Sequence, residues 1–312
     1  MRVAAILNPV AGGGLSARSW PAVQTALVAH FGPFSTHMTT KSDDAGAIAY
    51  ACARGGADTM LVCGGDGTMG EAANGLMRYR DETGVAVRLG LLPAGSGRDL
   101  VRSLNLPSSA LENVARIAQG RWRSIDAGRV SFVDDDGAPR TRCFLNIASV
   151  GVSGPTDRAV NAARLRAPGA GRLLFLFHAL RALVKYRFET VRVAVDDHPP
   201  IETAISLVAV ANGRFFGAGM MIAPDAQIDD GLFDVVILKA DSKLRLIRQM
   251  NLLYTGAHIG QDITMTLRGR RIVITPAGDP QQNAALVDMD GESPGRIPAA
   301  IEILPRAIEV QA

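Results

Sequence analysis

The sequence predicts an α/β unit over residues 1–124 and an antiparallel β-rich unit over residues 125–294. Strand-length apolar runs alternate with helix-length segments in the first third, which is typical of a parallel sheet with helical crossovers. From residue 125 the segments become mainly strand-like. The chain of 312 residues also exceeds the size at which a single core usually keeps growing. These three observations favour two domains.

The first unit is expected to bring its ligands to one edge of its sheet. Parallel strands joined by right-handed crossovers gather ligands at their carboxyl ends. The expected strands are 3–7, 35–38, 59–63 and 88–92, and the expected helices are 16–30, 43–54 and one from about residue 69.

The second unit is expected to be mainly antiparallel, with an Arg-rich helical insertion over 153–188 and a helix over 242–254. The last two strand-like pieces fit either unit, and the segment from about 295 to 312 is a candidate to return to the first. The expected strands are 124–133, 143–150, 191–195, 201–211, 233–238, 264–275, 299–304 and 307–310.

Composition excludes several classes of protein. The net charge of +3 is too small to indicate nucleic acid as the main partner. The three cysteines form no CxxC pair, which disfavours both a disulfide framework and a zinc site. The longest apolar run, 173–177, is far too short to span a bilayer. We therefore expect a soluble cytoplasmic protein.

Three glycine-rich turns follow expected strands, at 8–14, 64–68 and 93–97. Glycine lets the backbone approach an anion, and the first turn of a following helix adds a positive dipole. The sequence has no GxxxxGK[ST] loop, and no GxGxxG follows the first strand. These turns indicate polyphosphate binding through backbone amides and hydroxyls.

The motifs resemble those of the diacylglycerol kinase catalytic domain family, which includes sphingosine and ceramide kinases and bacterial lipid kinases. The similarity covers nearly the whole chain. It implies a three-layer nucleotide-binding domain of the NAD kinase/diacylglycerol kinase type, followed by an antiparallel β-sandwich-like domain. The motifs are Asn8-Pro9, Gly64-Gly65-Asp66-Gly67-Thr68, Gly95-Ser96-Gly97, Asn212-Gly213, Ala223-Pro224-Asp225-Ala226, Asp229-Asp230-Gly231 and Asp290-Gly291-Glu292.

This resemblance implies an ATP- and magnesium-dependent lipid kinase. Glu292 would be the general base, and Asp66 would be the second catalytic residue. Asp230 would give a carboxylate to a magnesium ion, and Gln227 and Leu232 would give backbone carbonyls. The implied ATP-binding residues are Asn8, Thr39, Gly64, Gly65, Asp66, Gly67, Thr68, Met69, Gly70 and Ser96.

The acceptor stays open among diacylglycerol, phosphatidylglycerol, a sphingoid base and ceramide. Two departures from the family pattern, Gly70 and Arg98 where relatives often have Asn, bear on nucleotide affinity. Asp126 is a candidate for a structural or metal-network role. The alternatives are an NAD kinase-like enzyme and a non-catalytic lipid-binding member of the fold.

The segment 172–188 mixes aromatic and aliphatic residues with Arg and Lys. As a helix it could lie on an anionic membrane with its apolar side buried. The expected partner is thus a membrane lipid, reached from the cytoplasmic face of the membrane. Packing of this helix on its own β-domain is the alternative, and the sequence is also compatible with a homodimer.

Overall fold

The structure is a computed structural model that describes residues 2–95, 97–166, 171–278 and 285–312. Its first half has a parallel sheet in the order β2-β1-β3-β4. The elements of this half are β1 (Val3–Leu7), α1 (Ala11–Phe31), β2 (Ser35–Met38), α2 (Asp44–Arg54), β3 (Thr59–Gly64), α3 (Asp66–Thr83), β4 (Arg88–Pro93), α4 (Asp99–Ser103) and α5 (Ala110–Ala118).

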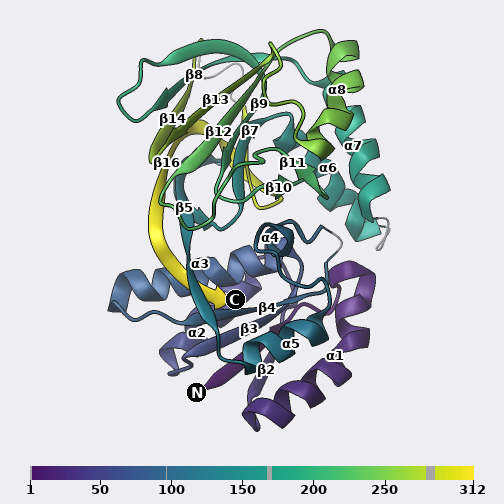
Figure 1. The fold of residues 1–312 in the computed structure, drawn as a ribbon, viewed down its shortest axis with the longest axis vertical. Helices are drawn as coiled ribbons and strands as arrows, with labels where there is room; N and C mark the ends of the chain where they lie inside the picture. The colour runs from purple at the N-terminus through teal and green to yellow at the C-terminus, as the bar shows by residue number, and fades with distance from the viewer. Residues whose placement is uncertain (1, 96, 167–170, 279–284) are drawn as a thin grey trace.

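Helices cover both faces of this sheet, which gives three layers (Figure 1). Leu27 of α1 and Val114 of α5 share an apolar cluster with Leu7 of β1 on one face. On the other face, Ala49 of α2 and Ala72 of α3 pack in a second cluster. The strands β1, β3 and β4 are therefore buried on both sides, as expected for a parallel sheet between helices, whereas the edge strand β2 is largely exposed.

The second half is antiparallel and encloses its own core. Strand pairings run β9-β7-β15-β16-β14-β8-β9, so they close on themselves around an apolar cluster. The elements are β5 (Trp122–Asp134), β6 (Pro139–Phe144), β7 (Ile147–Gly151), α6 (Ser153–Arg166), α7 (Gly171–Lys185), β8 (Glu189–Val195), β9 (Ile201–Ala211), β10 (Phe215–Phe216), β11 (Met220–Met221), β12 (Phe233–Lys239), α8 (Lys243–Thr255), β13 (Thr264–Gly269), β14 (Arg271–Pro276), β15 (Leu286–Met289) and β16 (Glu292–Gln311).

The long strand β16 joins the two halves, as Figure 1 shows by its curved path toward the first sheet. It pairs with β14, β15 and β5 in the second half. Near its end, Val310 pairs in parallel with Leu89 of β4. One sheet therefore runs through both halves, and the end of the chain lies in the first.

Several element boundaries differ from the sequence expectations because side chains capture backbone groups. The expected strand 143–150 divides into β6 and β7 where the Asp290 carboxylate accepts backbone N–H bonds from residues 145–147. The expected strand 264–275 divides in the same way at Arg270, whose N–H donates to Asp196. Conversely, 299–304 and 307–310 belong to one strand, with a register shift between them.

The helix after the second glycine turn begins at Asp66, not near Met69. Gly65 precedes it with an extended backbone (φ −92°, ψ −179°), so the helix starts directly after the strand. An acidic residue in a first turn is favoured by the helix dipole. The GGDGT motif thus ends β3 and forms the start of α3, with the first-turn amides of the helix at the edge of the sheet.

Candidate active site

The three glycine turns meet at the carboxyl edge of the parallel sheet. A Cβ atom added to Gly12 would lie 2.0 Å from the Ala94 carbonyl oxygen, and one added to Gly95 would lie 2.6 Å from the Gly65 Cα. The Asn8 side chain also donates to the Thr68 hydroxyl at 2.8 Å. These close approaches require glycine and hold the turns against one another.

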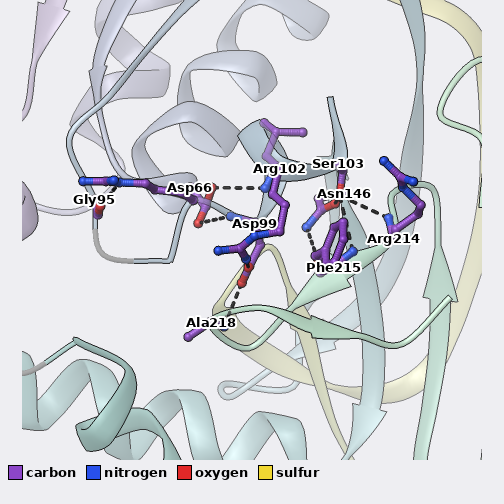
Figure 2. Close-up of polar contacts among 11 residues, drawn as sticks. Asp66, Gly95, Asp99, Arg102, Ser103, Asn146, Arg214, Phe215 and Ala218 are labelled. Atoms are coloured by element: carbon purple, nitrogen blue, oxygen red, sulfur yellow. Dashed lines mark hydrogen bonds and ion pairs between the residues drawn. The ribbon is translucent and has the colours of Figure 1, made fainter. Parts of the chain in front are cut away.

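Asp66 belongs to the second turn, and its side chain reaches the end of the third turn and the start of α4 (Figure 2). Its carboxylate accepts the backbone N–H of Asp99 at 3.2 Å and of Leu100 at 3.3 Å, at the start of α4. Burial, followed by the nearby Asp66 charge, raises the pKa of Asp99 to about 7. Hard cations such as Mg²⁺ prefer oxygen ligands, so the neighbouring carboxyl groups of Asp66 and Asp99 suit such an ion.

Asp99 is itself fixed by the second half of the chain. Its carboxylate accepts the Ala218 N–H at 2.8 Å and pairs with Arg102 at 2.6 Å. The Arg102 guanidinium lies over the Phe215 ring, with its carbon 5.4 Å from the ring centre. These contacts place the 215–218 segment beside the third glycine turn (Figure 2).

Ser103 makes a second bridge between the halves. Its hydroxyl donates to the Asn146 side chain at 2.9 Å and accepts the N–H groups of Arg214 and Phe215 at 3.1 and 3.3 Å. The Asn146 amide donates in turn to the Phe215 carbonyl at 2.7 Å. A buried, satisfied polar network of this kind fixes geometry, so it holds the segment 214–215 against α4.

The Asp290-Gly291-Glu292 turn joins β15 to β16. The Asp290 carboxylate accepts the backbone N–H groups of Leu145, Asn146 and Ile147 at 2.8, 3.1 and 3.0 Å. Burial raises the pKa of Asp290 to about 6, and these three bonds oppose the rise. Asp290 is therefore an anchor that fixes the position of Glu292.

Glu292 lies against the GGDGT turn. Its Oε1 atom is 3.2 Å from the point that a Cβ on Gly67 would occupy. Burial, followed by the neighbouring Glu71 charge, raises the pKa of Glu292 to about 7, although Arg142 opposes the rise. A carboxyl group with such a pKa can accept a proton near neutral pH.

A cavity of about 550 Å³ opens beside Glu292. It lies between α2 and α3 on one side and β6 with the β15–β16 turn on the other. Gly67 and Gly70 form part of its wall, together with Asp290 and Glu292. The candidate base thus faces a space that small ligand groups can enter.

The structure separates the expected nucleotide-binding residues into two groups. The first group is at the edge where the three glycine turns meet: Asn8 of the first turn, and Gly64, Gly65, Asp66, Gly67 and Thr68 of the second. The other expected residues lie away from the turns or cannot be placed. Thr39 is buried and its N–H donates to the Leu7 carbonyl, and the Met69 side chain lies in the core. Gly70 faces Asp290, and Ser96 lies outside the described residues.

The expected magnesium loop around Asp230 is held by protein contacts. The Asp230 carboxylate accepts the Leu232 N–H at 3.0 Å and pairs with Arg268, while the Gln227 side chain is exposed. Asp126 is buried and accepts the N–H groups of Gly231 and Arg306, both at 2.7 Å. Asp126 therefore ties this loop to β16, which is a structural role.

Another carboxylate group is close enough to hold a metal ion. One ligand oxygen from each of Asp43, Glu71 and Glu292 lies within 4.8 Å of the others. The Arg142 guanidinium already pairs with Asp43 and Glu292. Because this guanidinium already occupies an oxygen of two of the three carboxyl groups, we assign no metal to the cluster.

Sequence reasoning missed three residues of this site. Asp99 carried a usable signal, since it is an acid two positions after the third glycine turn. Glu71, five positions after Asp66, faces Glu292 from α3. Arg142 lies on a strand with no motif, so nothing in the local pattern marks it.

Comparison with known proteins agrees with this geometry. Residues 2–130 match the diacylglycerol kinase catalytic domain, and residues 146–312 match the YegS C-terminal NAD kinase beta sandwich-like domain. The fold and the two matches define a lipid kinase of the diacylglycerol kinase type. The chain belongs to the family defined by the YegS C-terminal NAD kinase beta sandwich-like domain, and the match of residues 2–130 to the diacylglycerol kinase catalytic domain confirms the resemblance seen in its motifs.

Individual relatives span nearly the whole chain. A diacylglycerol kinase of Mycobacterium tuberculosis (strain CDC 1551 / Oshkosh) is 29% identical over 311 residues, covering 99% of this chain and 94% of that protein. One of Bacillus subtilis (strain 168) is 28% identical over 277 residues, covering 88% and 84%. The crystal structure of a diacylglycerol kinase from Bacillus anthracis strain Sterne aligns with TM-score 0.70 at 21% identity, covering 99% and 96%, which supports the fold.

Proposed function

We propose that this kinase transfers the γ-phosphoryl group of ATP, with magnesium, to the hydroxyl group of a membrane lipid. The observation that carries the proposal is the approach of Glu292 Oε1 to the GGDGT turn, 3.2 Å from a Cβ position on Gly67. A proton acceptor from the second half thus lies beside a phosphate-binding turn of the first. We assign ATP to residues 1–124 and the lipid to residues 125–294.

Each part of the reaction has a candidate residue. The amides of the glycine turns hold the phosphates of ATP, and magnesium bound near Asp66 and Asp99 would neutralise their charge. Glu292 accepts the proton of the lipid hydroxyl. The hydroxyl oxygen bonds to the γ-phosphorus, the bond from that phosphorus to the bridging oxygen breaks, and ADP leaves with the electron pair.

We further propose that the loop 227–232 holds a second magnesium ion. Asp230 would give a carboxylate oxygen, and Gln227 and Leu232 would give carbonyl oxygens, a ligand set that suits this ion. The Asp230–Arg268 pair opposes the proposal, since the guanidinium occupies the carboxylate that the ion needs. Binding would therefore require Arg268 to move away.

The exposed face of α7 supports contact with a membrane. Phe177, Leu180 and Val184 follow helical spacing and are 60, 37 and 52% exposed, and Leu244 of the adjacent α8 is 58% exposed. The segment 176–188 contains Arg and Lys but no Asp or Glu. Apolar side chains flanked by cations suit an anionic bilayer surface, so we propose peripheral binding at the cytoplasmic face of the membrane.

The helices of the described residues differ in length or composition from a membrane-spanning helix. None of the helices there combines the length and the apolar character that a membrane crossing needs. The lipid must then be reached from the membrane surface if the proposed reaction takes place.

The acceptor can be identified by transfer of labelled γ-phosphate from ATP and magnesium to lipids in mixed micelles. Diacylglycerol, phosphatidylglycerol, a sphingoid base and ceramide are tested separately, with NAD as a water-soluble acceptor. We expect label in one lipid and none in NAD. Label in NAD would move the chain to the NAD kinase alternative, and no label in any acceptor would favour a non-catalytic lipid-binding protein.

A further inference from the structure

Arg142 of β6 joins two carboxylates that come from distant parts of the chain. Its Nη1 group donates to Glu292 Oε2 at 3.2 Å, and its Nη2 group donates to Asp43 Oδ1 at 2.9 Å. All three residues line the 550 Å³ cavity. One guanidinium is thus shared between the candidate base and a second acid.

Both ends of the Arg142–Glu292 pair are fixed by the backbone. The Asn74 side chain of α3 donates to the Cys143 carbonyl and accepts the Cys143 N–H, each at 2.7 Å. Glu292 is held through the anchored Asp290 turn described above. The pair therefore has a set geometry, unlike a mobile surface ion pair.

The charges around Glu292 come from three elements. Glu71 of α3 and Asp43, just before α2, add negative charge, and Arg142 of β6 adds positive charge. The Glu71 and Glu292 carboxyl groups also share a hydrogen bond, which requires a proton on one of them. Burial and these acids raise the pKa of Glu292, and Arg142 opposes the rise.

A general base must be ionised when the substrate binds. Without a nearby cation, a buried carboxyl group beside a second acid would hold its proton at neutral pH. A cation that paired with it alone would instead weaken its basicity. Because Arg142 shares its guanidinium with Asp43, the Glu292 carboxyl group should ionise more readily than without a cation and remain more basic than in an exclusive ion pair.

We propose that Arg142 is a positioning residue that keeps the Glu292 carboxylate ionised and directed at the GGDGT turn, and that Asp43 limits this effect by sharing the guanidinium. The inference rests on the proposed function, because it takes Glu292 as the base. The proposal adds Arg142 of the edge strand β6 as a positioning residue for Glu292, and Asp43 as the acid that shares its charge.

Titration of the Glu292 carboxyl group tests this without any activity measurement. The ¹³C shift of labelled glutamate carboxyls is followed against pH, and the Glu292→Gln spectrum assigns the resonance. Arg142→Gln is expected to raise the pKa of Glu292 by about one unit or more, the usual effect of losing an opposite charge this close. Asp43→Asn is expected to lower it, and Arg142→Lys to restore part of the wild-type value.

Arg140→Gln is the matched control, since Arg140 lies on the same strand and pairs with Asp134 away from the cavity. It should leave the Glu292 midpoint unchanged. An unchanged midpoint in Arg142→Gln would overturn the proposal. If that variant does not fold, Arg142→Lys and Asp43→Asn decide the question, and a failure of both to move the midpoint overturns it equally.

The pH profile of kcat/KM for lipid phosphorylation gives the second readout. Its acid limb should move to higher pH in Arg142→Gln and to lower pH in Asp43→Asn. An equal loss at every pH would indicate a merely structural role and overturn the proposal. If the carboxyl titration shifts as expected but Glu292→Gln keeps full transfer activity, the base assignment in the proposed function fails while the charge effect of Arg142 is supported.

Discussion

At the scale of single residues, burial and neighbouring charge give Glu292 a different free energy of ionisation from an exposed glutamate. The pKa of Glu292 in the folded chain is about 7, against 4.5 for an unperturbed glutamate. Between these values the folded state binds more protons than the unfolded state, so the free energy of unfolding falls as pH rises. The ionised Glu292 carboxylate that the proposed reaction needs therefore lowers the free energy of unfolding.

We predict that Glu292→Gln gains stability relative to the wild type as pH rises from about 5 to about 8. Gln cannot ionise, so it avoids the cost of the buried charge. Urea unfolding at several pH values measures the difference. The control is Glu82→Gln: hydrogen bonds from Tyr50 and Arg78 lower the pKa of Glu82, so that variant should lose stability relative to the wild type as pH rises through the acid range. A pH-independent difference for Glu292→Gln would contradict the prediction.

The Asp230 loop offers a second test at this scale. If Arg268 competes with magnesium for Asp230, Arg268→Gln should strengthen magnesium binding by roughly fivefold, because a partner worth on the order of 1 kcal/mol is removed. Asp230→Asn should weaken binding strongly. Calorimetry with magnesium and no nucleotide measures both, with Arg192→Gln, which breaks a pair with Glu202, as the control. Equal binding in all variants would remove the loop as a metal site.

The sequence predicted those site residues that belong to motifs, and it missed those defined by tertiary contact. Asp66 and Glu292 were expected from their turns, and the structure places both beside the glycine turns. Arg142 reaches the site from an edge strand through contacts that no sequence spacing records. Arg98, a departure from the family pattern, takes the left-handed backbone (φ 58°) and donates to the Gly95 carbonyl at 2.9 Å, so its side chain supports the third turn.

At the scale of elements, the alternating pattern of the first half predicted its strands closely, because β1, β3 and β4 are mainly apolar runs separated by helix-length segments. The strand boundaries of the second half were predicted less accurately. Its strand breaks at residues 145–147 and at Arg270 arise where Asp290 and Asp196 bind backbone N–H groups from far along the chain. Such long-range captures have no local signature.

The contact between the first and third glycine turns predicts a sharp difference between two glycine substitutions. Gly12 has φ 60° and no room for a Cβ beside Ala94, whereas Gly84 has φ 74°, a left-handed helical backbone and open space around it. Gly84→Ala should cost only the left-handed strain, about 1 kcal/mol. Gly12→Ala should cost more and weaken ATP binding, as measured by urea unfolding and calorimetry. Equal effects would show that the turns do not depend on this contact.

The exposed face of α7 predicts membrane binding. Phe177→Ser combined with Val184→Ser should reduce co-sedimentation with vesicles of phosphatidylglycerol and phosphatidylcholine by roughly tenfold or more, since each apolar side chain contributes on the order of 1–2 kcal/mol on burial. The control is Leu111→Ser on α5, another exposed apolar residue far from this face. Unchanged co-sedimentation of the double variant would contradict docking through α7.

At the scale of the whole molecule, the site exists because one sheet and one polar network fix the two halves. The turns of the first half and Glu292 of the second meet where β16 begins, before that strand continues to β4. The hydrogen bond between Ser103 and Asn146 joins the two halves at a second point. The order of motifs along the chain predicted that both halves contribute, but their relative placement depends on these contacts and could not be predicted.

The most direct test of this account is the rate of γ-phosphate transfer from ATP and magnesium to lipid in mixed micelles, compared between the wild type and Glu292→Gln, with circular dichroism to show that both are folded. General base catalysis typically contributes about 10²- to 10⁴-fold. The account predicts that a folded Glu292→Gln loses at least about 100-fold in rate, whereas a variant that keeps the wild-type rate would contradict the assignment of Glu292 as the base.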